Sequence, residues 1–289
     1  MDFQETCYLS PLVKINYAQG LDNGPPFVVL HGGSARWQYS ANLLEALALD
    51  WHVFAPDFRG HGKSGHVKAR YLLQDYVGDI ASFLSEVVKD RAVIYGHSLG
   101  GEVAVMLAAL HPGLPRAIIV GDAPLSNRNH ASEVPSHRLQ NELWYRVAGH
   151  PEDEIAEALR EMPIPVVGQP ELRKAREVFG EDSPWFALQA TSLHQLDPDM
   201  LAAVLAGPEI MLVGYEPETL LPKITCPVLL LQADATFGSA LPDDEVDLAL
   251  RLLPRASHVK LSGIGHPLHG PPGGTHIVIS AIRAFLAGL

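Results

Sequence analysis

One pentapeptide, Gly96-His97-Ser98-Leu99-Gly100, limits what this chain can fold into more than any other segment. An apolar run over 92–95 precedes it, and a helix-forming stretch over 102–110 follows it. A serine held between a strand and a helix sits in a tight, strained turn, for which the two glycines leave space. Its hydroxyl then lies above the strand end, beside free helix N–H groups that favour an anion. The pattern predicts that Ser98 is a nucleophile; the alternative is a serine that only caps the helix.

Further segments that we predict as strands recur along the chain, each followed by turn residues. They lie at 27–30, 51–55, 92–95, 117–120, 228–231 and 258–261. Helix-like stretches lie between or after these strand segments, at 37–49, 72–89, 99–110, 244–253 and 275–286. Most of the strand segments are apolar on both faces, as strands of parallel sheets are. The alternation predicts an α/β fold with a doubly wound, mostly parallel sheet.

The middle of the chain, from about residue 125 to residue 222, has a different character. Helical patterns at 152–161 and 171–179 are interrupted by prolines, and no strand signal is strong. We therefore predict a core made of residues 1–124 and 223–289, with a helical cap of residues 125–222 inserted in it.

Composition and charge exclude several classes of protein. Of the 289 residues, 47% are hydrophobic, which is enough for a sizeable core. The net charge is −12, from 21 basic and 33 acidic residues, which argues against nucleic acid or an anionic membrane surface as the main partner. No apolar stretch approaches the ~18 residues of a membrane span. The first residues also lack the pattern of a secretory signal, so we expect a cytoplasmic location and no membrane association.

The sequence also predicts a site without a cofactor or a metal. Cys7 and Cys226 are too far apart to form a CxxC metal site, and no phosphate loop or dinucleotide fingerprint is present. The late histidines are separated by Gly and Pro turns, which does not suit a metal site. We expect a small-molecule substrate, and the sequence leaves the oligomeric state open.

Taken together, four segments make the chain resemble the α/β-hydrolase family. They are the pentapeptide, His31-Gly32-Gly33, the stretch from Pro56 to Ser64, and Gly263-Ile264-Gly265-His266. Their order and spacing fit over nearly the whole length, and the weakest part is 125–222, where that family inserts a helical cap. The resemblance implies the α/β-hydrolase fold and a serine nucleophile, but it does not define the substrate.

A serine hydroxyl is a poor nucleophile until a base takes its proton, and histidine is the natural base near neutral pH. Among fourteen histidines, His266 follows the last predicted strand in a Gly-rich turn, where the resemblance places the base. His269 is the nearest alternative. His97 should point away from the serine by alternation, and we expect structural roles for it and for the loop residues His31 and His61.

Acyl transfer also needs two backbone N–H groups directed at the oxyanion. One is that of Leu99, directly after the serine, and the other is that of Gly33, in the turn after the first predicted strand. Ser34 could add its hydroxyl.

A catalytic triad has an acid as its third member, which orients the histidine. At this residue the sequence departs from the family pattern. The family usually carries it after the strand that corresponds to 228–231, in a stretch like G-x-x-D. In this chain the expected position holds a threonine, and the nearest carboxylate, Asp234, lies two residues earlier. Asp234 is our first prediction. Asp122 is the second, because some members carry the acid after the preceding strand. Asp243 and Asp244 are the third, with helix N-capping as their alternative role.

The sequence therefore predicts a serine hydrolase that cleaves a small, largely apolar ester, thioester, lactone or amide through an acyl-enzyme. Hydrolysis of a carbon–carbon bond is a variant on the same site. An alternative from another class is a ligand receptor of the same fold with slow or vestigial hydrolysis, suggested by the displaced acid.

Overall fold

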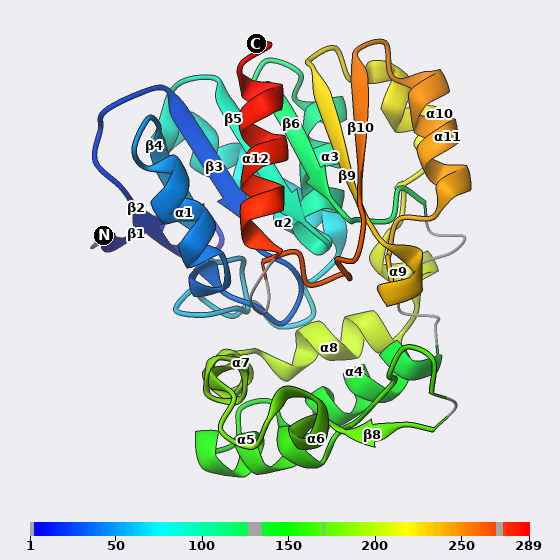
Figure 1. The fold of residues 1–289 in the computed structure, drawn as a ribbon. Coiled ribbons are helices and arrows are strands. Elements are labelled where there is room, and N and C mark those ends of the chain that lie inside the picture. The colour runs from blue at the N-terminus through cyan, green and yellow to red at the C-terminus, as the bar shows by residue number, and fades with distance from the viewer. Residues whose placement is uncertain (1–2, 127–134, 170, 270–273) are drawn as a thin grey trace.

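The computed structural model describes residues 3–126, 135–169, 171–269 and 274–289. Eight strands form one sheet in the order β1-β2-β4-β3-β5-β6-β9-β10 (Figure 1). Strand β2 pairs antiparallel with β1 and β4, and the pairs from β4 to β10 are parallel. The predicted mostly parallel α/β sheet is confirmed. The strands are β1 (Gln4–Leu9), β2 (Lys14–Gln19), β3 (Pro26–Leu30), β4 (His52–Pro56), β5 (Ala92–His97), β6 (Pro115–Gly121), β9 (Val228–Ala233) and β10 (Ala256–Leu261).

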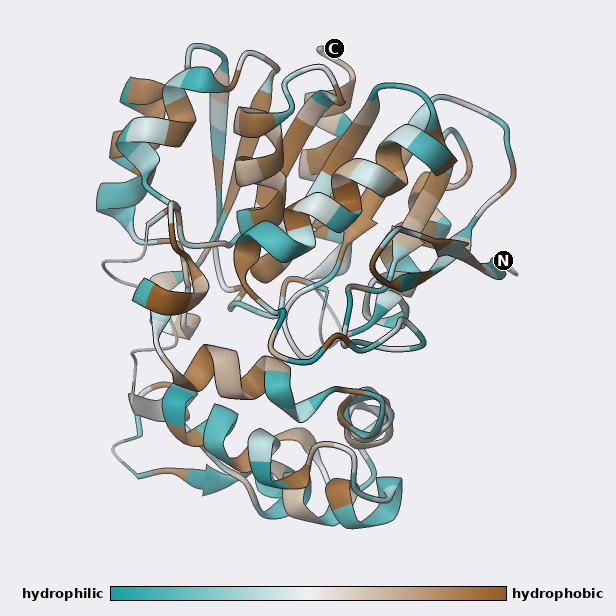
Figure 2. Ribbon diagram, turned by 180° about the vertical axis from the view of Figure 1, so that it is seen from behind, coloured by the Kyte–Doolittle hydropathy of each residue, from teal (hydrophilic) through white to brown (hydrophobic). Residues whose placement is uncertain are grey.

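Helices cover both faces of the sheet. On one face lie α1 (Ala41–Leu47) and α12 (Thr275–Leu286); on the other lie α2 (Leu73–Phe83), α3 (Leu99–Leu110) and α11 (Asp243–Leu252). Successive side chains of a strand point to opposite faces. Accordingly, Phe27 and Val29 of β3 pack with α1 and α12, whereas Val28 and Leu30 pack with α2 and α3. This two-sided burial explains why the inner parallel strands are largely apolar, whereas β10, at the sheet edge, is mixed (Figure 2).

The helices between β6 and β9 form a group of their own, which we call the helical segment (residues 135–220). Most of this group lies beyond the carboxyl ends of the parallel strands (Figure 1). Helices α7 to α10 each begin with a proline, which suits the first helical position because its N–H would have no intrahelical partner. The elements are α4 (Pro135–Val147), α5 (Glu152–Glu161), β7 (Pro163–Ile164), β8 (Arg173–Lys174), α6 (Ala175–Phe179), α7 (Pro184–His194), α8 (Pro198–Leu205), α9 (Pro208–Met211) and α10 (Pro217–Leu220). The division into core and cap domains stays a prediction.

Several elements differ from the sequence-based expectation. The sequence pattern does not predict the antiparallel strands β1 and β2, because polar residues such as Glu5 and Asn16 interrupt their apolar runs. The stretch 37–49 divides into a 3₁₀ turn, η1 (Trp37–Ser40), and α1, and 72–89 ends in a π-helical turn, η2 (Leu84–Val88). The expected helix at 171–179 is confined to α6, after the short pair of β7 and β8. Short 3₁₀ turns also occur at η4 (Leu221–Lys223) and η5 (Ala235–Phe237). Within the described ranges, no helix combines the length and apolarity needed to cross a membrane.

Candidate active site

Ser98 lies in the turn between β5 and α3, as the pentapeptide predicts. Its φ of 52° and ψ of −121° are strained for a residue with a side chain. The flanking glycines are required by contact distances. A Cβ on Gly96 would lie 2.0 Å from the Gly100 carbonyl oxygen, and one on Gly100 would lie 2.4 Å from that of Leu30. The local sequence thus forces the backbone into the conformation that presents the Ser98 hydroxyl.

His266 lies in the loop after β10, and its Nε2 is 3.1 Å from the Ser98 Oγ. The imidazole side chain is 25% exposed, so one edge is open to a ligand or to water. A proton on the Ser98 hydroxyl can pass directly to Nε2 at this distance. Of the fourteen histidines, the structure therefore brings the predicted one to the serine.

Asp122 follows β6 directly, and its Oδ2 accepts a hydrogen bond from the Nδ1 of His266 at 2.7 Å. The carboxylate is fully buried and also accepts from the N–H groups of Ala233 and Ala240 and from the hydroxyl of Ser239. Burial raises the pKa of Asp122, but the hydrogen bond from His266 and the other donors outweigh it and hold the pKa below its ordinary value. This geometry keeps a negative charge beside the imidazole.

Asp234, our first prediction for the acid, is not brought to His266. Its carboxylate accepts hydrogen bonds from the N–H groups of Thr236 and Gly263, both at 2.9 Å. These two bonds lower its pKa, and they tie the side chain to its own turn and to the loop after β10. Asp234 caps the turn η5 through one oxygen, and its other oxygen is used by Gly263. The structure thus brings the second candidate, Asp122, to His266 and not the first.

The third candidates, Asp243 and Asp244, lie in the first turn of α11. The carboxylate of Asp243 accepts from the amide of Gln232 and the ammonium of Lys260. Negative charge in a first helical turn is favourable, which fits their alternative role at the helix N-terminus.

The other histidines near the serine surround the base. The Nε2 of His97 donates to the backbone oxygen of His266 at 2.7 Å, and the two rings are 4.8 Å apart. Burial, together with the neighbouring His266 and His269, lowers the pKa of His97 well below its ordinary value. His269 shares a hydrogen bond with the hydroxyl of Tyr95 at 2.5 Å instead of with Ser98. His97 therefore does not simply point away from the site; it holds the loop that carries His266.

The turn after β3 lies against the serine. A Cβ on Gly32 would be 3.4 Å from the Cβ of Ser98. Within the described ranges, no backbone carbonyl accepts from the N–H of Gly33 or of Leu99. This agrees with the sequence-based prediction that these two N–H groups serve an oxyanion, which stays a prediction.

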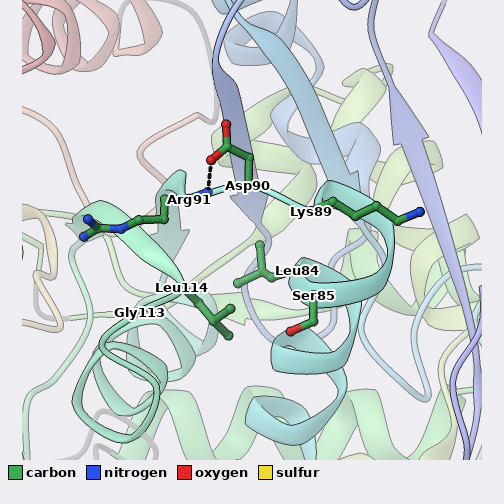
Figure 3. A pocket seen from close by; sticks show the side chains of 7 residues that line it. All are labelled: Leu84, Ser85, Lys89, Asp90, Arg91, Gly113 and Leu114. Atoms are coloured by element: carbon green, nitrogen blue, oxygen red, sulfur yellow. Dashed lines mark hydrogen bonds between the residues drawn. The ribbon is translucent and has the colours of Figure 1, made fainter.

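A pocket of about 350 Å³ lies away from Ser98 (Figure 3). Its lining includes Leu84, Lys89, Arg91 and Leu114, which precede β5 and β6 or belong to η2. It therefore opens at the amino ends of the parallel strands, whereas Ser98 lies at the carboxyl ends. Among the residues that the structure describes, no cluster of three or more metal-ligating side chains is present.

Comparison with known proteins identifies the family of this chain. The family model described as "Alpha/beta hydrolase family" matches residues 27–279. The chain belongs to the alpha/beta hydrolase family. A human "serine hydrolase-like protein" is 34% identical to this alpha/beta hydrolase over 131 residues, which are 45% of this chain and 62% of that protein. A protein of the same description from Danio rerio is 34% identical over 105 residues, 36% of this chain and 32% of that protein. The chain thus spans less than two thirds of the length of these curated relatives.

Solved structures resemble this alpha/beta hydrolase over nearly its whole length. The enol-lactonase from Burkholderia xenovorans LB400 superposes with a TM-score of 0.72 at 19% identity, covering 98% of this chain and 100% of that one. At this identity the likeness supports the fold and not the substrate.

Sequence reasoning missed the part of the helical segment that reaches the site. The amide of Gln189 on α7 donates to the carbonyl of Ser34, and Met200 on α8 lies next to Gly33. Neither residue belongs to a motif, and the contact of Gln189 joins parts of the chain 155 positions apart. Only the packing of the helical segment on the core could identify them.

Proposed function

We propose that this protein is a serine hydrolase that cleaves a small, largely apolar ester, thioester, lactone or amide through an acyl-enzyme. One observation carries the proposal: Ser98, His266 and Asp122 form a continuous hydrogen-bonded relay. A relay of this kind activates a hydroxyl for nucleophilic attack. The family supports the same reading.

The first half of the reaction makes the acyl-enzyme. The Ser98 oxygen attacks the substrate carbonyl, and His266 accepts the hydroxyl proton at Nε2. Asp122 stabilises the resulting imidazolium through its bond to Nδ1. The N–H groups of Leu99 and Gly33 stabilise the tetrahedral oxyanion, helped by the N-terminus of α3. When the intermediate collapses, His266 returns its proton to the leaving group and the acyl chain remains on Ser98.

The second half releases the acid. A water molecule takes the place of the leaving group, His266 accepts one of its protons, and the hydroxide attacks the acyl carbonyl. Collapse of the second intermediate breaks the bond to Ser98, and His266 returns the proton to the serine oxygen. No other reactant is consumed. In this proposal the helical segment acts as a cap, since Met200 of α8 closes over the turn that carries Gly33.

The receptor alternative was suggested by a displaced acid. Asp122 accepts a hydrogen bond from His266, so a carboxylate is present beside the base and a displaced Asp234 no longer argues for a receptor. Relatives differ in what their names say they hydrolyse: one, from Mesorhizobium japonicum, is a 2-(acetamidomethylene)succinate hydrolase, 32% identical over 100 residues. We therefore propose the reaction class and leave the substrate to a panel.

The test compares the wild-type protein with Ser98→Ala on p-nitrophenyl esters of increasing acyl length, together with lactones and diketones. We expect the wild type to turn over at least one ester, and Ser98→Ala to lose at least about 10³-fold in kcat, because the nucleophile is absent. Equal thermal unfolding of the two proteins is the control for folding. Turnover that is unchanged in Ser98→Ala would contradict the proposal.

A further inference from the structure

The oxyanion turn, which we define as Gly33 and Ser34, is held from several sides. The N–H of Ser34 donates to the Nε2 of His61 at 3.2 Å, and its carbonyl accepts from the Nε2 of Gln189 at 3.2 Å. Ser34 has a φ of 58°, a conformation that is unfavourable for a residue other than glycine. Such a conformation persists where surrounding contacts fix it. Hydrogen bonds on both sides of Ser34 supply these contacts.

Both the oxygen and the nitrogen of the Gln189 side-chain amide are hydrogen-bonded. The residue lies on α7 and is only 3% exposed. Its Oε1 accepts from the hydroxyl of Tyr39, while its Nε2 donates to Ser34. Burial raises the pKa of Tyr39 far above its ordinary value, so the hydroxyl keeps its proton and remains a donor. The amide is thus fixed in one orientation, with its N–H directed at the turn.

A second helix of the helical segment reaches the same turn. A Cβ on Gly33 would lie 3.3 Å from the Cε of Met200 on α8. The start of α8 is tied to the core through Asp197, whose N–H donates to the carbonyl of Gly60 at 2.8 Å and whose carboxylate accepts from Tyr71 at 2.5 Å. Helices α7 and α8 therefore both contact the turn that would bind the oxyanion.

We propose that Gln189 is a positioning residue that orients the oxyanion turn from the helical segment. It acts through Ser34, and so sets the direction of the neighbouring Gly33 N–H. The inference rests on the proposed function for its catalytic consequence. It implies that the oxyanion hole is complete only while α7 is seated on the core, so the helical segment takes part in transition-state stabilisation as well as in covering the site.

The kinetic experiment uses Gln189→Leu with Gln195→Leu as its matched control. Gln195 ends the same helix, and its Oε1 is buried without a hydrogen-bond partner among the described residues. For Gln189→Leu we expect kcat for a p-nitrophenyl ester to fall roughly tenfold, with KM changed less than about twofold, since only the transition state uses the oxyanion hole. The inhibition constant of phenylboronic acid, which forms a tetrahedral adduct on a serine, should rise by a similar factor. Gln195→Leu should keep the wild-type values.

A second readout needs no turnover, so it separates this inference from the proposed function. Backbone hydrogen exchange in a peptide that covers residues 32–36 should be faster in Gln189→Leu than in the wild type and in Gln195→Leu. Tyr39→Phe removes the hydrogen bond to the Oε1 of Gln189 and keeps the one to Ser34, so it should change exchange and kcat in the same direction but by less. This variant serves if Gln189→Leu does not fold. Exchange in Gln189→Leu equal to that of Gln195→Leu would overturn the inference, as would faster exchange with an unchanged kcat. Absence of esterase activity in the wild type would instead contradict the proposed function.

Discussion

At the scale of single residues, the relay depends on which carboxylate faces His266. We expect Asp122→Asn to lower kcat by about 10²–10⁴-fold, because an amide can present its N–H to Nδ1 and cannot stabilise the imidazolium. Asp234→Asn should stay within about twofold of the wild type, since its side chain accepts from the N–H groups of Thr236 and Gly263 rather than from His266. Ester turnover of both variants, with circular dichroism as a check on folding, makes the comparison. A larger loss in Asp234→Asn than in Asp122→Asn would contradict the geometry.

The same two residues explain why the sequence indicated the pairing of His266 with Ser98 but ranked Asp234 before Asp122. Ser98 and His266 are marked by glycine-rich turns directly after predicted strands. Asp122 and Asp234 follow β6 and β9, which are neighbours with Gly121 and Leu231 in register. Asp122 and Asp234 therefore both lie at the carboxyl ends of neighbouring strands, close to the same edge of the sheet. The choice between them depends on loop hydrogen bonds that no strand or motif pattern encodes.

At the scale of elements, the turn between β5 and α3 tolerates no side chain at its glycines. Gly100→Ala would place a Cβ 2.4 Å and 2.8 Å from the carbonyl oxygens of Leu30 and His31, which are backbone atoms and cannot move aside. We expect a loss of about 3 kcal/mol or more in the free energy of unfolding. Gly113→Ala is the matched control, because no atom lies within 4 Å of its added Cβ. Urea unfolding of the two variants measures the difference, and equal stabilities would contradict the close packing described for this turn.

Elements were predictable where burial gives a strong pattern. The inner parallel strands are buried on both faces and stand out as apolar runs, as Val228 to Leu231 do. Strand β1 lies at the edge, where exposed residues such as Gln4 and Leu9 interrupt the pattern. In the helical segment, prolines begin several of the helices and interrupt the pattern, and α5 has the clearest amphipathic period among the described helices. The weaker the burial, the less the sequence alone could predict.

At the scale of the whole molecule, two buried imidazoles link stability to pH. Burial lowers the pKa of His31 to about 4; burial and the neighbouring His31 lower that of His61 to about 3. Below an unfolded value of 6.5, the unfolded chain binds protons that the folded protein does not. The free energy of unfolding should therefore fall as the pH falls from about 6.5 towards 4, by up to about 1.4 kcal/mol per pH unit for each histidine.

Urea unfolding at several pH values between 7 and 4.5 measures this dependence. His61→Gln keeps a donor and an acceptor at the position but removes one titrating group, so its stability should fall less steeply with acid than that of the wild type. Identical slopes for the two proteins would show that His61 does not stay neutral in the folded state.

The central claim is that Ser98 is the catalytic nucleophile, and one measurement tests it directly. The wild-type protein is incubated with a fluorophosphonate probe, and the modified residue is located by mass spectrometry of its peptides. The relay of Ser98, His266 and Asp122 predicts a single covalent adduct on Ser98 and none on the Ser98→Ala protein. An unlabelled Ser98 in wild-type protein that hydrolyses esters would contradict the account.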